Sequence, residues 1–310
     1  MPLVSIRHLT AYRYRNPVAL GEHRMMLRPL ESYDQRLISA DLAIWPQPAV
    51  LRNVHDVFGN CVSIARFTGR ADRLSVESRV TLEHTPHPAF DLDGESYAAS
   101  LPFAYSPEDR PDLAQSIERR HADPTGELEA WARRFVRRAG PTSLRTLLTD
   151  MTHAIRGEFA YGTRLTGAPQ APLETLALGS GSCRDFAMLM IEAVRSLGLA
   201  ARFVSGYVYS SSAKAGRSGG GHTHAWARIF LPSCGWVEFD PTNGIVGNQD
   251  LVRVAIARDP RQAVPLHGTW AGLPADDLGM DVEVEVSVGA DTDADAQTQP
   301  APLRRVAQGR

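Results

Sequence analysis

The segment that decides the fold is Gly179-Ser-Gly-Ser-Cys183-Arg-Asp-Phe186. An apolar stripe at helical spacing follows it, made of Phe186, Leu189, Met190, Ala193, Val194 and Leu197. This pattern predicts a helix that begins at Cys183 and ends before Gly198. A helix N-terminus stabilises negative charge, so Cys183 is placed where a thiolate and a developing oxyanion are both favoured. The alternative is a small residue that merely caps the helix.

A second segment supplies the partners that a thiol nucleophile needs. Residues 222–243 read His-Thr-His-Ala-Trp-Ala-Arg-Ile-Phe-Leu-Pro-Ser-Cys-Gly-Trp-Val-Glu-Phe-Asp-Pro-Thr-Asn. We interpret the stretches 223–231 and 236–240 as two strands of a hairpin. If Leu231 pairs with Gly235, then Asp240 is the diagonal neighbour of His224 on the same face of the sheet. A register shifted by one residue would put the two side chains on opposite faces.

These segments predict a catalytic triad in which Cys183 is the nucleophile, His224 the base and Asp240 the orienting acid. Glu238 shares the parity of Asp240 and is an alternative orienting acid. A zinc site built on His222 and His224, with Asp240 or Cys183, is a second alternative.

Several neighbours have quieter interpretations. Tyr161 is either a core aromatic residue or a donor to the oxyanion, and Asp185 is a first-turn acid that could hold the loop. Cys61 and Cys234 are expected to be bystander thiols. The Gly- and Ser-rich stretch 210–221 is either a mobile rim over the site or a surface insertion without a role.

The rest of the chain divides into a β-rich part, a mixed part and a tail. Short strands predict a β-sandwich-like N-terminal domain over residues 1–110, the clearest strand being Leu74–Glu83. Residues 111–288 are predicted to form an α+β domain, with helices near 128–136 and 144–155, a loop over 162–182, a strand at 200–209, and a last strand at 282–288. Residues 289–310 lack periodicity and are expected to be disordered.

Composition excludes several classes of protein. The chain has 310 residues, 43% of them hydrophobic and 22% charged, which is incompatible with a wholly disordered chain or a polytopic membrane protein. The net charge of -2 gives no reason to expect nucleic acid or a membrane as partner. Three cysteines do not make a disulfide framework, and the N-terminus lacks a signal-like apolar core, so we expect a cytoplasmic protein.

The motifs together resemble the bacterial transglutaminase-like superfamily. The resemblance is carried by Gly-Ser-Cys183-Arg-Asp, Thr-His224-Ala-Trp and Gly-Trp-Val-Glu-Phe-Asp240-Pro-Thr-Asn. Ile6-Arg-His8-Leu-Thr-Ala-Tyr12 and Asp56-Val-Phe-Gly59-Asn60 resemble the β-rich N-terminal region found in that group. Gly-Val often precedes the cysteine in this family, whereas Ser182 stands here.

The resemblance implies a papain-like α+β core with a Cys183-His224-Asp240 triad and no required metal or cofactor. It also implies acyl-transfer or amide-hydrolysis chemistry on a peptide or protein substrate. We expect hydrolysis rather than crosslinking, while the oligomeric state is left open. The alternatives are a catalytically silent binding or scaffold protein that keeps the fold, and a zinc hydrolase.

Overall fold

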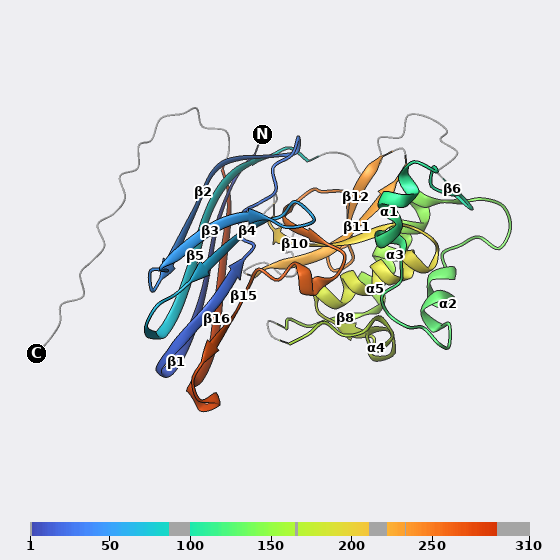
Figure 1. Cartoon of the computed structure of the whole chain (residues 1–310). Helices are drawn as coiled ribbons and strands as arrows, with labels where there is room; N and C mark the ends of the chain where they lie inside the picture. Colours follow the sequence, from blue (N-terminus) through green and yellow to red (C-terminus); the bar gives the residue numbers. More distant parts are fainter. Residues whose placement is uncertain (1, 87–99, 165–166, 211–221, 233, 290–310) are drawn as a thin grey trace, which may run out of the picture.

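Two sheets lie side by side, one built mostly by the first 84 residues and one by residues 201–257 (Figure 1). A computed structural model of the chain describes residues 2–86, 100–164, 167–210, 222–232 and 234–289. The predicted rim at 210–221 falls almost entirely outside these ranges, as does the tail after residue 289. No helix among the described residues is long and apolar enough to cross a membrane.

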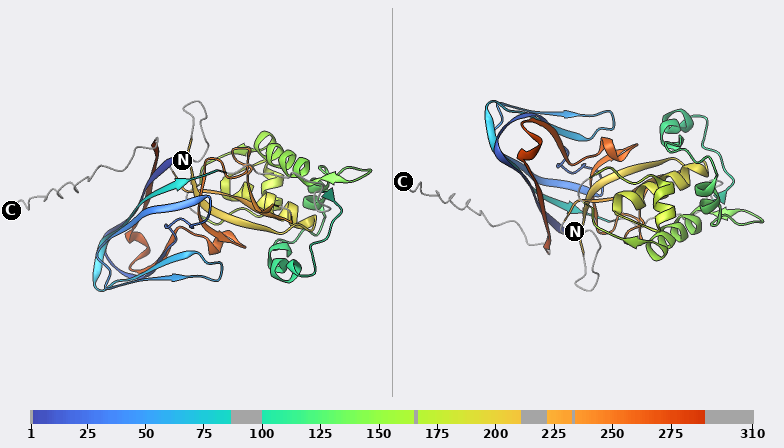
Figure 2. Two further views of the ribbon diagram at one scale, coloured as in Figure 1. Left: turned by 90° about the horizontal axis from the view of Figure 1, so that it is seen from above. Right: turned by 90° about the horizontal axis from the view of Figure 1, so that it is seen from below.

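The larger sheet is organised around one long strand, β1 (Leu3–Met25). The order of its strands is β2-β5-β1-β4-β3, with bounds β2 (Gln35–Trp45), β3 (Val50–His55), β4 (Cys61–Arg66) and β5 (Arg70–His84). The first half of β1 pairs with β5, and its last residues pair with β4. This confirms a β-rich N-terminal region, and Figure 2 shows that its sheet is curved.

The C-terminal strands also join this larger sheet. β15 (Leu266–Ala271) pairs with the second half of β1, and β16 (Asp277–Gly289) pairs with the first half. The sequence correctly predicts a strand at 282–288 but assigns it to the α+β domain, whereas β16 pairs with β1 in the larger sheet. Valine alternates with polar residues in this strand, at positions 282, 284, 286 and 288, which indicates that one face of the strand is buried. The alternation does not indicate which sheet the strand joins.

The smaller sheet and its helices form the second layer. Its order is β13-β12-β11-β10-β14, with bounds β10 (Ala201–Val208), β11 (His224–Leu231), β12 (Gly235–Asp240), β13 (Ile245–Val246) and β14 (Leu251–Ala257). The helices are α1 (Asp109–Ile117), α2 (Glu127–Arg133), α3 (Leu144–Glu158), α4 (Pro172–Leu178) and α5 (Cys183–Ser196). Short strands β6 (Ser100–Leu101), β7 (Thr142–Ser143), β8 (Ala160–Tyr161) and β9 (Ser180–Gly181) link them.

Helix α5 is the centre of the core. It packs against β10 and β11, and the apolar residues Phe186, Leu189, Met190, Ala193 and Val194 are all buried. Helix α3 buries the predicted stripe from Leu144 to Ile155. The structure corrects two expectations: the loop at 162–182 contains the short helix α4, and the helix expected at 128–136 ends at Arg133.

The N-terminal region covers the edge strand β14 of the smaller sheet. The side chain of Asn60 bonds to the backbone of Ile256 at both N–H and C=O (2.8 and 2.7 Å). The Gln35 side chain bonds in the same way to the backbone of Arg253 (2.7 and 3.1 Å). Two side-chain amides therefore take the place of a neighbouring strand and satisfy an edge that would otherwise be open.

We predict that Asn60→Ala lowers the free energy of unfolding by about 2–4 kcal/mol. Removal of the Asn60 side chain leaves the N–H and C=O groups of Ile256 buried without hydrogen-bond partners. Each unpaired buried group costs about 1–3 kcal/mol. Urea unfolding measures this difference. Asn53→Ala is the matched control, because Asn53 lies exposed on β3 and bonds only to Ser63 among the described contacts. Equal urea midpoints for the two variants would contradict the prediction.

Candidate active site

The β11–β12 hairpin brings His224 and Asp240 together. Leu231 pairs with Gly235 and Ala227 with Phe239, so the register predicted from the sequence is confirmed. His224 Nε2 lies 2.8 Å from Asp240 Oδ2, and both residues are almost fully buried. The hydrogen bond fixes the orientation of the imidazole ring.

Asp240 is held by three further hydrogen bonds from the turn that follows it. The backbone N–H groups of Thr242 and Asn243 donate to Oδ1 at 2.9 and 3.3 Å. The side-chain amide of Asn243 donates to Oδ2 at 2.8 Å. Burial alone would raise the pKa of Asp240, but the charge of His224 and these donors outweigh it and lower the pKa. The parity of the strand does not single out Asn243, although this residue ends the motif Asp240-Pro-Thr-Asn243.

The environment of His224 favours its charged form. Burial by itself lowers the pKa of His224, but the Asp240 carboxylate and then the Cys183 thiol raise it to about 10. Nε2 bonds to Asp240, while Nδ1 has no hydrogen-bond partner among the described atoms. The ring is therefore held as an imidazolium beside a cysteine.

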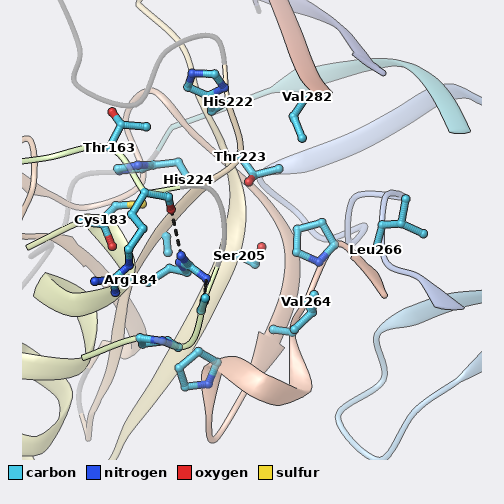
Figure 3. A pocket seen from close by; sticks show the side chains of 18 of the residues that line it. Thr163, Cys183, Arg184, Ser205, His222, Thr223, His224, Val264, Leu266 and Val282 are labelled. Atoms are coloured by element: carbon cyan, nitrogen blue, oxygen red, sulfur yellow. Dashed lines mark hydrogen bonds between the residues drawn. The ribbon is translucent and has the colours of Figure 1, made fainter. Parts of the chain in front are cut away.

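Cys183 is the first residue of α5, as the sequence predicts. It faces the cavity beside His224 (Figure 3). The N–H groups in the first turn of a helix have no intrahelical acceptor, so they can donate to an oxyanion formed at the cysteine. Cys61 and Cys234 form no disulfide and do not line this cavity.

Asp185 holds the loop that precedes the cysteine. Its Oδ2 accepts hydrogen bonds from the N–H and the hydroxyl of Ser182 at 2.7 and 2.8 Å. Its Oδ1 accepts from Arg164 and from the backbone of Gln170, both at 2.7 Å. This carboxylate is fully buried, and its four bonds fix the entry into α5. Asp185 is thus a positioning residue, one of the two roles open from the sequence.

Glu238 does not orient His224. Its carboxylate bonds to Arg253 Nη1 at 3.0 Å and forms an ion pair with Arg228 at 3.2 Å. Arg253 also donates to Asp34 of the N-terminal region. Glu238 therefore belongs to a charged network between the two sheets, and parity alone could not distinguish it from Asp240.

Two other residues that the sequence singles out also line the cavity. His222 and Tyr161 both contribute to its wall. Burial, followed by the proximity of Cys183, raises the pKa of Tyr161. In the part of the chain that the structure describes, no group of three or more His, Cys, Asp or Glu side chains is arranged to hold a metal ion.

Two family models match the chain. Residues 4–83 match the bacterial transglutaminase-like N-terminal region, and residues 129–241 match the transglutaminase-like superfamily. The chain therefore contains a transglutaminase-like core and, before it, a β-rich region similar to the one found in bacterial transglutaminase-like proteins. The resemblance stated from the motifs is therefore confirmed.

The chain is also similar to mycobacterial proteins of similar length. Uncharacterized protein Rv2569c of Mycobacterium tuberculosis is 29% identical over 282 residues, which cover 85% of this chain and 86% of that protein. Uncharacterized protein ML0607 of Mycobacterium leprae is 34% identical over 129 residues, which cover 41% of this chain and 46% of that protein.

A solved structure shares the fold. The crystal structure of a "Putative Cysteine Protease" from Cytophaga hutchinsonii aligns with a TM-score of 0.67 at 19% identity. The alignment covers 95% of this chain and 92% of that one. At this identity the likeness shows the fold alone, and it confirms the α+β class with a β-rich N-terminal region.

The transglutaminase-like core and the N-terminal region both line the cavity at Cys183. It has a volume of about 320 Å³. Figure 3 shows Cys183, Arg184 and Thr163 on one side, and Val264, Leu266 and Val282 on the other. The site therefore lies between the two sheets, a position that the sequence did not predict.

We predict that Asp240→Asn destabilises the protein most strongly at mildly acidic pH. Histidine has a pKa of about 6.5 in an unfolded chain, and the folded protein raises the pKa of His224 to about 10. The stabilisation that His224 contributes to the folded state is therefore complete below about pH 6.5 and is lost as the pH rises through about 10. Aspartate has a pKa of about 3.9 in an unfolded chain, and the folded protein lowers the pKa of Asp240. The stabilisation that Asp240 contributes to the folded state is therefore present above about pH 3.9 and is lost as the pH falls further.

The difference in unfolding free energy between the wild type and Asp240→Asn is therefore expected to reach about 3 kcal/mol near pH 5. It should shrink as the pH approaches 10. Urea unfolding of both proteins over this pH range makes the measurement. A difference that grows steadily from pH 5 to 10 would contradict the coupled His224–Asp240 pair.

Proposed function

We propose that the protein is a thiol enzyme that attacks a carboxamide or peptide bond through Cys183, His224 and Asp240. The observation that carries the proposal is the buried 2.8 Å bond between His224 and Asp240, with Cys183 beside the imidazole at a helix N-terminus. A nucleophile, a base and an orienter thus meet in a cavity. A protein that kept only the fold would have no need for this arrangement.

The geometry supports a two-step acyl transfer. The sulfur of Cys183 attacks the carbonyl carbon, and the N–H groups of the first turn of α5 stabilise the oxyanion. The His224 imidazolium gives its proton to the departing amine, so the C–N bond breaks and a thioester remains. His224, now neutral, takes a proton from water as the water attacks the thioester, which releases the acid and the cysteine.

Hydrolysis is the outcome that we favour for the second step. Water and a primary amine differ only in which of them reaches the thioester, so the triad itself does not choose between them. Mass spectrometry of a peptide amide incubated with enzyme, with and without an added primary amine, separates the two. Hydrolysis predicts that free acid remains the main product in the presence of amine. A main product that carries the amine would show that the enzyme is a transferase.

We predict that Cys183 is the cysteine that iodoacetamide alkylates fastest at pH 6 in the folded protein. His224→Ala should slow this reaction at neutral pH by about 10²-fold or more, because it removes the group that accepts the thiol proton and then stabilises the Cys183 thiolate by its positive charge. His222→Ala is the matched control, since His222 lines the same cavity but does not bond to Asp240. Peptide mapping by mass spectrometry gives the rate for each cysteine.

Two outcomes would contradict the nucleophile assignment. The first is faster alkylation of Cys61 or Cys234 in the folded protein. The second is an equal loss of rate from His222→Ala, with metal found in the purified protein, which would instead favour the zinc hydrolase.

A further inference from the structure

One face of the larger sheet both packs on the core and lines the cavity. β1 and β16 are paired with Thr10 opposite Val282 and His8 opposite Val284, so residues of this parity share a face. At one end of that face, Val284 is buried in a cluster with Tyr207 and Val252 of the smaller sheet. Two residues away, Val282 packs against the edge of the same cluster, and Val282 and Thr10 also line the cavity of Cys183.

The wall of the cavity opposite Cys183 is aliphatic. It is formed by Val264, Leu266, Met280 and Val282 (Figure 3 labels three of them). The polar side chains nearby bond to one another: His8 bonds to the Tyr207 hydroxyl at 2.8 Å and to the Thr10 hydroxyl at 3.0 Å. Burial lowers the pKa of His8 to about 4, so this wall carries no charge at neutral pH.

Three arginine side chains line other parts of the cavity, and two of them have acidic partners. Arg164 forms an ion pair with Asp185 at 2.7 Å, and Arg261 forms one with Asp259 at 2.8 Å. The Arg261 side chain is 77% exposed, which places it at the rim. Arg184, beside the nucleophile, also lines the cavity and donates to the backbone of Gly167 and Arg164. An acidic substrate group is therefore the competing possibility.

We propose that Met280 and Val282, with Val264 and Leu266, form a subsite for an aliphatic side chain of the substrate. The N-terminal sheet would then be a substrate-recognition element as well as a cover for the core. This inference rests on the proposed function of Cys183. Apolar walls favour apolar groups, and a single methylene in a hydrophobic pocket changes discrimination by about tenfold or more.

The test uses three chloroacetamides that differ only in the tail on nitrogen. The tails are n-butyl, 2-methoxyethyl, which has the same number of heavy atoms but is polar, and 2-carboxyethyl, which is acidic. In each reaction the Cys183 sulfur forms a bond to carbon as chloride leaves. Each rate is divided by the iodoacetamide rate of the same variant, so that the intrinsic reactivity of the thiol cancels.

We expect the n-butyl probe to react about tenfold faster than the 2-methoxyethyl probe in the wild type. Val282→Thr and Met280→Gln should each reduce this ratio at least threefold, because they place polar atoms in the wall. Met280→Leu should preserve the ratio. Val286→Thr is the matched control, since Val286 lies on the same strand and face but packs in the cluster of Val284, outside the cavity.

Three results would overturn the subsite. They are a wild-type ratio near one, a ratio that survives both Val282→Thr and Met280→Gln, or fastest reaction with the acidic tail. A different result would contradict the proposed function itself, namely that iodoacetamide reacts with Cys183 no faster than with Cys61 or Cys234.

Discussion

The hydrogen bond between His224 and Asp240 is the interaction on which the site depends. Two buried charges are costly unless they are paired and fully hydrogen-bonded. The Asp240 carboxylate meets this condition with the imidazole and with donors from Thr242 and Asn243. The imidazolium that results lies beside Cys183 at a helix N-terminus, so the positive charge and the helix dipole favour the same thiolate.

The position of this pair depends in turn on how the two sheets meet. β14 is an edge strand of the smaller sheet, and the side chains of Gln35 and Asn60 satisfy its backbone. The N-terminal sheet therefore packs directly on the transglutaminase-like core. The same sheet face lines the cavity of Cys183 at Thr10 and Val282. The contact between the N-terminal sheet and the smaller sheet therefore both holds the two sheets together and forms part of the wall of the site.

The sequence predicts the local parts of this arrangement. The apolar stripe after Cys183 predicts helix α5, and the parity of His224 and Asp240 predicts the register of the β11–β12 hairpin. Both features depend on residues that are close in the chain. The sequence did not predict that β16 returns to β1, since alternation marks a buried face without naming its cover. The sequence also does not exclude Glu238 as the orienting acid. Glu238 accepts a hydrogen bond from Arg253, which lies on a strand that comes later in the chain. Long-range pairing decides such choices.

The protonation state of His224 tests the central claim most directly. Nuclear magnetic resonance of protein labelled with ¹⁵N-histidine reports both ring nitrogens as a function of pH, and His224→Gln identifies the signal. The structure predicts that both nitrogens of His224 stay protonated through neutral pH and that a proton is lost near pH 10. A neutral imidazole at pH 7, titrating at or below about pH 6.5, the ordinary histidine value, would contradict the charged pair.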